Sequence, residues 1–572
     1  QIAVQLLICQ LHVGKLDTSF CHAKVPRSLP SSGKNPECSS QVFPMHTESG
    51  ASPTHVTLLI GAFLLLSVPA MFLPELSHEE ALHATIAREM LHNNDFVTPH
   101  FQGSAILTAP MCAWVLGLIS MTVGLNEVTI RLVGILPTVL LALICMFTVH
   151  RAAPGCGTLA TGAAVCTSLA AISIGGVAEN DMLFALFINA AWISFYLLSR
   201  ERKRWMYAWS TSHLLLACAL FTGGPLALFY FYFPLLLMRR PLKVIRRFWK
   251  LEHLFPLAVL VIGMIGWVLL VPFLKEEIVR VFQEFTPVEH AVGYLRRVIE
   301  FPVRAVIGFL PWAFLAWPGF CAAFHPLEKN PVLCQYLRAI VYSLFYFFWI
   351  IPASDSKVLL PLIGPAAILL GMNYELLIRR HKRQLRILPL ALSGIAAAGI
   401  IATAVTGVLL RLQKISWQVP TSMLLLSGGC MLAAAGLVTA IWFGRRKAPV
   451  WLLVAGSAMA LQLTVAGSIQ VYNHLYNSHS RDFARSFSAD LPTGVTVYEI
   501  IPGHDLYPSE CYYLDRRVVR INDIADLPIG VQSVYVLGRH RMPISPFYEW
   551  HELSDIKEYK KIKLRLWKGV RR

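Results

Sequence analysis

The sequence predicts an all-α polytopic membrane protein that carries a small α/β domain after its last membrane span. Of its 572 residues, 55% are hydrophobic and only 15% are charged, which is too apolar for a soluble chain of this length. Apolar runs of about 20 residues recur between His55 and Gly467, and each is long enough to cross a bilayer as a helix. After residue 470 the apolar runs give way to short strand-like segments.

The residues before the first apolar run, 1–54, form a polar leader that we exclude from the fold. The chain begins at Gln1, and its first methionine is Met45. Residues 1–44 mix polar residues, proline and cysteine without periodicity, so Met45 is one interpretation of the true start. We interpret His55–Leu73 as an uncleaved first span, because no typical cleavable signal follows Met45.

We expect a transmembrane domain at residues 55–469 with about thirteen helical spans. The run 55–73 is followed by twelve others, at 128–149, 156–177, 182–198, 205–221, 225–238, 253–274, 303–324, 333–352, 358–376, 387–409, 421–443 and 449–468.

Lysine and arginine gather in short loops that fall on one face of this predicted bundle. These loops are Arg200–Arg204, Arg239–Lys250, Arg379–Arg386 and Arg445–Lys447. The positive-inside rule makes this face cytoplasmic. The net charge of +17 therefore reflects membrane orientation and does not indicate nucleic-acid binding. The outer face then carries Asp181, the amphipathic loop 275–302, the segment Ser354–Lys357 and the domain 470–572.

Residues 470–572 are expected to form the outer α/β domain. A helix is predicted at Ser480–Ala489, and strands are predicted at Val495–Ile501, Tyr512–Ile521, Ser533–Leu537 and Lys561–Trp567.

An acidic pair, Glu79-Glu80, follows the first span and precedes a short helix-like pattern. One interpretation is a solvated turn and an amphipathic helix on the membrane surface. The side of the pair depends on the run 105–124, which Pro110 interrupts. If this run crosses the bilayer, the pair is cytoplasmic. If it lies along the outer surface, the pair shares a side with Asp181.

Three outer-face positions are candidates for one polar site: the acidic pair, Asp181 and Lys357. Ionisable residues at span ends mark functional sites when they face a cavity within the bundle, although each alone is more often an anchor. The loop 275–302 has the same two interpretations, because it either belongs to the site or only braces the bundle.

The order of these motifs resembles the GT-C membrane glycosyltransferases, in particular the group of the lipid A aminoarabinose transferase (ArnT) and the protein O-mannosyltransferases, glycosyltransferase families 39 and 83. The motifs that carry the resemblance are Glu79-Glu80, Ile86–Leu91, Asp95–Gly103, Arg131-Leu132, Asp181, Gly224–Leu228 and Ser356–Pro361. The resemblance covers about residues 56–376 and extends to the outer tail. It implies a GT-C bundle with surface helices on the outer face, so that 105–124 is expected to lie on the membrane surface.

The resemblance also implies a reaction, in which a sugar moves with inversion from a polyprenyl-phosphate donor to lipid A, another envelope glycan or a protein hydroxyl. This would take place at the periplasmic face of a bacterial inner membrane. A carboxylate must deprotonate or orient the acceptor, and cations must balance the leaving phosphate. By this resemblance Glu79, where the family has Asp, and Glu80 supply the catalytic carboxylate, and Asp181 is the supporting acid. Glu79 and Asp181 are also the candidate ligands for a divalent cation (Mg, Mn or Zn).

Two lysines that are common in ArnT-like members are absent here. Ala109 stands in place of the lysine of a Glu-Lys-Pro motif, and Gly223 in place of a lysine before the Gly-Pro turn. The cations that could bind the donor phosphate instead are Lys357, Arg88, Arg296, Arg297 and Arg304.

These departures keep an alternative open, a catalytically impaired member that binds lipid-linked sugars or scaffolds a complex. A transporter is the third hypothesis, although the sequence has no two-halves repeat and its charges lie at span ends.

Overall fold

The computed structural model describes residues 53–572 with gaps. The undescribed residues are 1–52, 73–74, 107, 156, 239–243, 271–290, 352–355, 413–420, 477–480, 482–483, 485–486, 489–490, 493, 501–507, 522, 529–530, 539–546 and 555–564. The predicted leader, the first part of the outer loop 275–302 and much of the predicted helix Ser480–Ala489 therefore lie outside the described residues.

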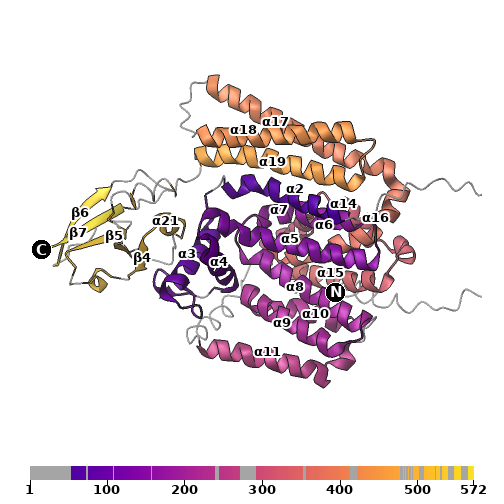
Figure 1. The fold of residues 1–572 in the computed structure, drawn as a ribbon, viewed down its shortest axis with the longest axis horizontal. Helices are drawn as coiled ribbons and strands as arrows, with labels where there is room; N and C mark the ends of the chain where they lie inside the picture. The colour runs from indigo at the N-terminus through magenta and orange to yellow at the C-terminus, as the bar shows by residue number, and fades with distance from the viewer. Residues whose placement is uncertain are drawn as a thin grey trace, which may run out of the picture. The chain divides into compact units, whose positions relative to one another are not determined.

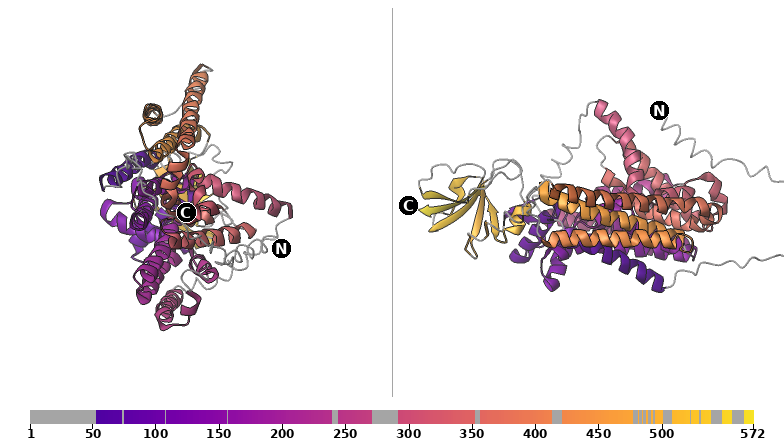
Figure 2. Two further views of the ribbon diagram at one scale, coloured as in Figure 1. Left: turned by 90° about the vertical axis from the view of Figure 1, so that its right-hand side faces the viewer. Right: turned by 90° about the horizontal axis from the view of Figure 1, so that it is seen from above.

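Helices make up most of the described chain before residue 477 (Figure 1). They are α2 (Pro53–Phe72), α3 (His78–Asn93), α4 (Met111–Val123), α5 (Glu127–Ala152), α6 (Gly157–Thr167), α7 (Leu169–Gly175), α8 (Asn180–Tyr196), α9 (Trp205–Gly223), α10 (Leu226–Leu237), α11 (Leu251–Leu270), α13 (Ala291–Gly308), α14 (Ala313–Ala316), α15 (Pro331–Ile350), the 3-10 helix η6 (Ser356–Leu362), α16 (Ile363–Leu385), α17 (Ile387–Leu412), α18 (Thr421–Gly444) and α19 (Val450–Tyr476). Helices α17, α18 and α19 run side by side (Figure 2).

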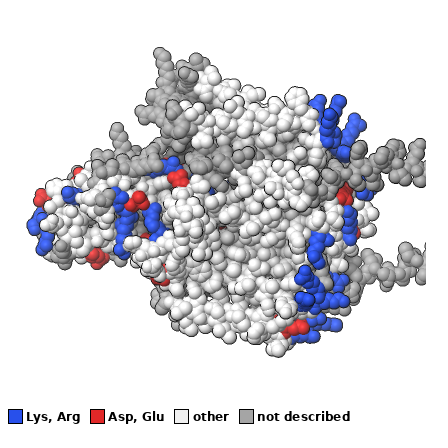
Figure 3. Space-filling view, in the orientation of Figure 1, with Lys and Arg blue, Asp and Glu red and all other residues white. Residues whose placement is uncertain are grey.

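The predicted helical membrane fold is confirmed. Within the described ranges, eight helices are long and apolar enough to cross a membrane, and two bent helix pairs raise this number to ten. The other predicted spans correspond to α2, α9 and α10. Figure 3 shows a bundle flank nearly free of charged side chains, with lysine and arginine gathered at one end of the bundle. An apolar flank of this kind fits contact with lipid.

The predicted span at 303–324 is broken by a sharp bend. The chain turns by 92° between the helical segments Gly293–Gly308 and Ala313–Gly319, which together are apolar enough for one broken span. Pro311 lies in the bend, and because proline has no N–H group it cannot continue the helical hydrogen-bond pattern. The bend brings α13 beside α7, α15 and η6, where it lines the cavity described below.

The run 105–124 does not form a full span. Its helix α4 has 13 residues, which at about 1.5 Å per residue is too short to cross the roughly 30 Å hydrocarbon core. A short antiparallel pair, β1 (His100–Phe101) and β2 (Ser104–Ala105), precedes it. Helix α4 packs on α3, and together they share a small apolar core. This agrees with the expectation of surface helices after the first span.

The C-terminal region forms a five-stranded mixed sheet in the order β4-β3-β5-β7-β6. Its elements are β3 (Thr496–Ile500), α21 (Pro508–Tyr513), β4 (Arg517–Arg520), β5 (Ser533–Gly538), β6 (Tyr548–Ser554) and β7 (Arg565–Arg571). Strand β3 pairs in parallel with β4 and β5, whereas β7 pairs antiparallel with β5 and β6. The sheet confirms a small α/β region, while the predicted domain limits at 469 and 470 stay a prediction.

The first half of the predicted strand Tyr512–Ile521 is wrong, because Tyr512 and Tyr513 belong to helix α21. Their aromatic side chains favour strands locally, but here tertiary packing decides their conformation. Helix α21 packs against α3, and the Tyr513 hydroxyl accepts a hydrogen bond from the backbone N–H of Leu76 at 2.9 Å. The sheet region is thereby attached beside the N-terminus of α3.

Candidate functional site

The two adjacent acids at the start of α3 differ completely in environment. Ser77 and Glu80 form a capping box, in which the Ser77 N–H donates to Glu80 Oε2 at 2.8 Å and the Glu80 N–H donates to Ser77 Oγ at 3.2 Å. Glu80 is 2% exposed. Its Oε1 accepts a hydrogen bond from the Ala178 N–H at 3.3 Å and lies 3.4 Å from Arg131 Nε. Glu80 therefore joins α3 to α5 and to the loop before α8.

Glu79 is exposed, and in the part of the chain that the structure describes its carboxylate has no recorded hydrogen bond or ion pair. It is the first-turn acid that remains available for chemistry, whereas Glu80 holds the helix in place. The spacing Ser77-x-x-Glu80 before an apolar run is a sequence signal for a capping box, and it could have separated the two roles.

Asp181 lies in the first turn of α8, where the helix dipole favours a carboxylate. Lys357, at the start of η6, places its Nζ 3.5 Å from Asp181 Oδ2 and 2.9 Å from Glu179 Oε2. The structure thus unites two predicted residues, Asp181 and Lys357, and adds Glu179. The signal for Glu179 was its position in the same span-end motif, two residues before Asp181.

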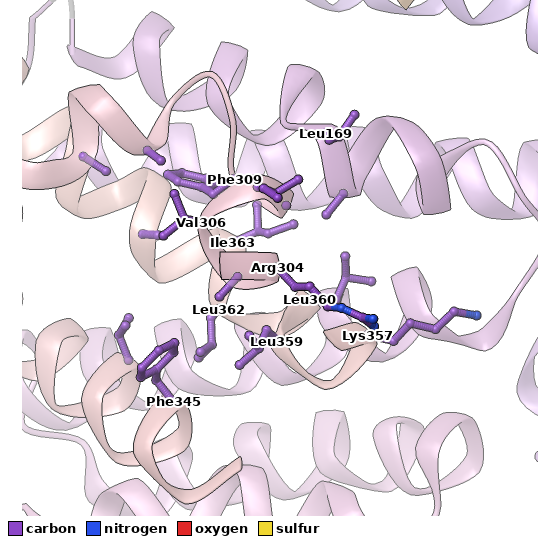
Figure 4. A pocket seen from close by; sticks show the side chains of 18 of the residues that line it. Leu169, Arg304, Val306, Phe309, Phe345, Lys357, Leu359, Leu360, Leu362 and Ile363 are labelled. Atoms are coloured by element: carbon purple, nitrogen blue, oxygen red, sulfur yellow. The ribbon is translucent and has the colours of Figure 1, made fainter. Parts of the chain in front are cut away.

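A cavity of about 600 Å³ opens beside Lys357, between α7, α13, α15 and the η6–α16 segment. Its lining is predominantly apolar, and its charged members are Arg304 and Lys357. Figure 4 shows Lys357 and Phe345 toward opposite ends of this cavity, with Phe309 and Leu362 in the apolar part. The cavity is therefore an apolar groove whose cationic end adjoins the carboxylates of Glu179 and Asp181.

Of the other predicted phosphate-binding cations, Arg304 lines this cavity, whereas Arg88, Arg296 and Arg297 do not. Arg88 donates to the Tyr512 carbonyl at 3.2 Å and stacks 4.8 Å from the centre of that ring, so it faces the C-terminal sheet region. Arg296 and Arg304 both pair with Glu300 on α13, at 2.5 Å and 2.8 Å. Of the three predicted cations on α13, it is Arg304 that lines the cavity together with Lys357.

The two positions without the expected lysines also have defined surroundings. The Ala109 carbonyl accepts a hydrogen bond from Asn180 Nδ2 at 3.4 Å, so this position adjoins the Asp181 motif. At Gly223 a Cβ atom would overlap the ring of Phe184 on α8. A lysine at residue 223 would therefore require Phe184 to move.

His83 lies on the inner side of α3 and is 4% exposed. Its Nε2 is 3.5 Å from Asn180 Nδ2, so it fills the space between α3 and the start of α8. Burial lowers the pKa of His83 to about 4, although the nearby Glu179 charge acts in the opposite direction. The imidazole is therefore neutral at neutral pH, and its role is to pack α3 against the Asp181 motif.

A divalent cation fits these residues poorly. Beside Asp181, one of the two predicted metal ligands, the Lys357 ammonium already provides positive charge and also pairs with Glu179. Within the described ranges, no three His, Cys, Asp or Glu side chains gather as metal ligands do. We therefore derive no step through a metal ion bound by Glu79 and Asp181.

Comparison with known proteins gives several relatives of one kind, although no family model matches the chain. The undecaprenyl phosphate-alpha-4-amino-4-deoxy-L-arabinose arabinosyl transferase of Enterobacter sp. (strain 638) is 25% identical over 449 residues, which cover 75% of this chain and 78% of the relative. The enzyme of the same name from Edwardsiella ictaluri is 28% identical over 341 residues, which cover 56% and 60% of the two chains.

Two crystal structures of ArnT from Cupriavidus metallidurans share the fold. The apo structure has a TM-score of 0.66 at 17% identity and covers 89% of this chain and 97% of ArnT. The structure bound to undecaprenyl phosphate has a TM-score of 0.65 at 17% identity, with coverage of 90% and 98%. Together with the sequence relatives, they confirm the predicted resemblance to ArnT-like GT-C glycosyltransferases.

Replacing Glu80 should destabilise the protein, whereas replacing its neighbour should not. Glu80→Ala removes the capping box and leaves Arg131 buried without this carboxylate, a change that typically costs about 3–5 kcal/mol. Glu79→Ala, the matched control, removes an exposed acid and should change stability by less than about 0.5 kcal/mol. Thermal unfolding of the purified protein in detergent measures both, and equal melting temperatures for the two variants would contradict the structural role of Glu80.

His83 should make the protein less stable in acid. Its pKa rises from about 4 in the folded protein to 6.5 in the unfolded chain, so between these values the unfolded chain binds the additional proton. The free energy of unfolding therefore falls as the pH falls from 6.5 to about 4, by about 3 kcal/mol from this group. Unfolding measured across this range should show a smaller acid loss in His83→Gln than in the exposed α3 control His92→Gln. Identical pH profiles would contradict the assignment.

Proposed function

We propose that this chain is a glycosyltransferase that moves a sugar from a polyprenyl-phosphate donor to an envelope acceptor. The observation that carries the proposal is the apolar cavity whose end holds Arg304 and Lys357, with Lys357 in turn bonded to Glu179 and Asp181. Such a cavity accommodates an isoprenoid tail along its apolar walls and a phosphate at its cationic end.

The donor phosphate would contact Arg304 and Lys357. Arg304 presents a planar guanidinium that can bind two phosphate oxygens, and Lys357 adds a point charge. Glu179 and Asp181 hold the lysine ammonium in position before the donor arrives. The undecaprenyl phosphate named for the relatives and for one ArnT structure is a carrier of this class.

The proposed reaction is a single displacement. The acceptor hydroxyl oxygen attacks the anomeric carbon of the sugar from the face opposite the phosphate, and its proton passes to the Glu79 carboxylate. The bond from the anomeric carbon to the phosphate oxygen breaks, and its electron pair leaves with the polyprenyl phosphate. Arg304 and Lys357 offset the charge that develops on this leaving group. Glu80 fixes the helix from which Glu79 acts.

The chain is a multi-pass membrane protein, and we place it in a bacterial inner membrane with the site facing the periplasm. Supporting this orientation, the basic residues gather at one end of the bundle (Figure 3), as the positive-inside rule requires for a cytoplasmic face. Helix α3 contacts both the Asp181 motif and α21 of the sheet region, so these parts share one side. The acceptor is proposed to be lipid A, another envelope glycan or a protein hydroxyl.

The catalytic assignment predicts a large loss of transfer in Glu79→Gln. A general base contributes about 10²–10⁴ in rate, so kcat should fall at least about a hundredfold. Asp181→Asn should lower kcat less, by about tenfold, because Glu179 still holds Lys357. Transfer from undecaprenyl phosphate-linked aminoarabinose in proteoliposomes, followed by mass spectrometry, measures both, with the exposed sheet-region acid Glu549→Gln as control. Full activity in Glu79→Gln would end the assignment.

Two arginines on α13 allow a matched test of donor binding. Arg304 lines the cavity and Arg296 does not, yet both pair with Glu300. Arg304→Gln should therefore raise the KM for the donor about tenfold through the lost contact to phosphate, whereas Arg296→Gln should leave it within about twofold. Equal KM values for the two variants would contradict the placement of the phosphate.

One observation favours the alternative of a catalytically impaired member. The ring of Phe184 fills the space that a side chain at residue 223 would need. A protein of this kind would bind the lipid-linked donor with the same dependence on Arg304 but would transfer no sugar to any acceptor.

A further inference from the structure

A groove of about 410 Å³ lies between α9 and α11 and shares no lining residue with the donor cavity beside Lys357. Helix α11 packs on α9 at the edge of the bundle (Figure 1). Only 17% of the α11 span is buried within the protein, so most of this helix faces lipid. Apart from Ser210 and His213, the residues that line the groove are apolar. The groove is therefore a site for a hydrocarbon chain on the lipid-facing surface.

The groove has the length of one bilayer leaflet and begins near the basic end of the bundle. Its lining lies within residues 210–221 of α9 and 255–264 of α11. These segments measure about 17 Å and about 14 Å along the helix axes, close to half of the roughly 30 Å hydrocarbon core. Both begin within two turns of Arg204 and Lys250, which directly precede the two helices. Lysine and arginine gather at that end of the bundle (Figure 3).

The histidine in the groove wall is engaged within the protein. His213 Nε2 lies 2.7 Å from the Tyr232 hydroxyl on α10, and His253 Nε2 on α11 lies 2.9 Å from the same hydroxyl. Their Nδ1 atoms lie 2.7 Å and 2.8 Å from the backbone carbonyls of Trp209 and Phe248. These contacts join α9, α10 and α11, so the groove between α9 and α11 has a fixed width.

Arg204 flanks the mouth of the groove on the α9 side. Its guanidinium carbon lies 5.9 Å from the centre of the Tyr207 ring. Tyr207 precedes the lining residue Leu214 by seven residues, which is about two helical turns, so both side chains lie on one face of α9. Arg204 is exposed and has no recorded ion pair in the part of the chain that the structure describes. Its charge is therefore available on the groove side of α9.

Arg247, the last residue of the 3-10 helix η3 (Val244–Arg247), flanks the mouth on the α11 side. It pairs with Glu252 at 3.0 Å. Glu252 precedes the lining residue Val259 by seven residues, so it lies on the groove face of α11. Glu252 offsets the charge of Arg247, but the exposed Lys250 has no recorded ion pair among the described residues. The mouth therefore carries a net positive charge.

We propose that this groove binds an anionic phospholipid of the leaflet at the basic end of the bundle. One acyl chain lies in the groove, and the phosphate lies at the mouth that Arg204 and Arg247 flank. Guanidinium groups bind phosphate oxygens well, and basic pockets between membrane helices suit anionic headgroups. A zwitterionic headgroup brings an ammonium of its own, which these arginines disfavour. The inference goes beyond the proposed function and requires neither Glu79 nor the donor cavity.

Two glycines allow a matched steric test. At Gly263, which lines the groove, and at Gly429 on α18, an added Cβ atom meets no heavy atom within 4 Å. Gly263→Leu fills the groove and should weaken lipid binding at least about tenfold, whereas Gly429→Leu adds the same side chain elsewhere and should change it less than about twofold. The probe is dioleoyl phosphatidylglycerol, titrated into the full-length protein in detergent and followed by native mass spectrometry.

Two exposed arginines at the basic end allow a matched test of charge. Arg204→Gln should weaken binding of the probe about fivefold and leave dioleoyl phosphatidylcholine unaffected, because one cation near the headgroup is lost. Arg446→Gln, in the loop between α18 and α19 and outside the groove, should change neither lipid by more than about twofold. Because Arg204 is exposed, this variant decides the proposal if Gly263→Leu does not fold.

Losses in Gly263→Leu and Arg204→Gln that neither control shows support the proposal. Equal affinities of the wild-type protein for phosphatidylglycerol and phosphatidylcholine overturn it, and so do equal losses in the groove variants and their controls. Undecaprenyl phosphate is the third lipid in the titration. If Gly263→Leu weakens its binding more than that of the probe, the occupant is an isoprenoid carrier and the proposal is overturned. Conversion of a dimer to a monomer by Gly263→Leu, visible in the same spectra, assigns the groove to a second copy and also overturns it.

Discussion

The site depends first on the carboxylate of Glu80. One oxygen closes the capping box with Ser77, and the other meets Arg131 and the backbone of Ala178. A buried carboxylate is tolerated only where hydrogen bonds and a counter-charge satisfy it, so these partners must all be in place together. That requirement fixes the start of α3 against α5 and the Asp181 motif. The exposed Glu79 next to it can then act from a rigid support.

Much of the architecture could be predicted from the sequence, because hydropathy indicates where the membrane-spanning helices lie. Long apolar runs have one stable solution in a bilayer, the helix, so nearly every predicted span has a helix at its position. Hydropathy did not reveal the bend within residues 303–324, because the composition stays apolar through it. The prediction also failed at Tyr512 and Tyr513, where local preference for a strand is outweighed by packing of α21 against α3.

The site was partly predictable for a different reason. The motif order identified Asp181 and Lys357, and the structure brings these two into contact. It did not identify Glu179, nor did it separate the role of Glu80 from that of Glu79. The Ser77-x-x-Glu80 spacing signals the capping box. The contacts of Glu80 with Arg131 and of Glu179 with Lys357 depend instead on which side chains approach one another in space. Among the arginines, only three-dimensional position distinguishes Arg304 at the cavity from Arg88 at the sheet region.

The contact between Tyr513 and the backbone of Leu76 has a consequence for how such proteins diverge. Leu76 immediately precedes the helix cap, and Arg481 reaches Glu127 at the start of α5 nearby, at 2.8 Å. The C-terminal region is thus bonded to the backbone just before α3 and to the first turn of α5. Exchange of this region between homologues would have to keep a side-chain pair like Arg481–Glu127, whereas the backbone N–H at residue 76 is supplied by any residue except proline. The C-terminal region and the start of α5 are therefore expected to change together.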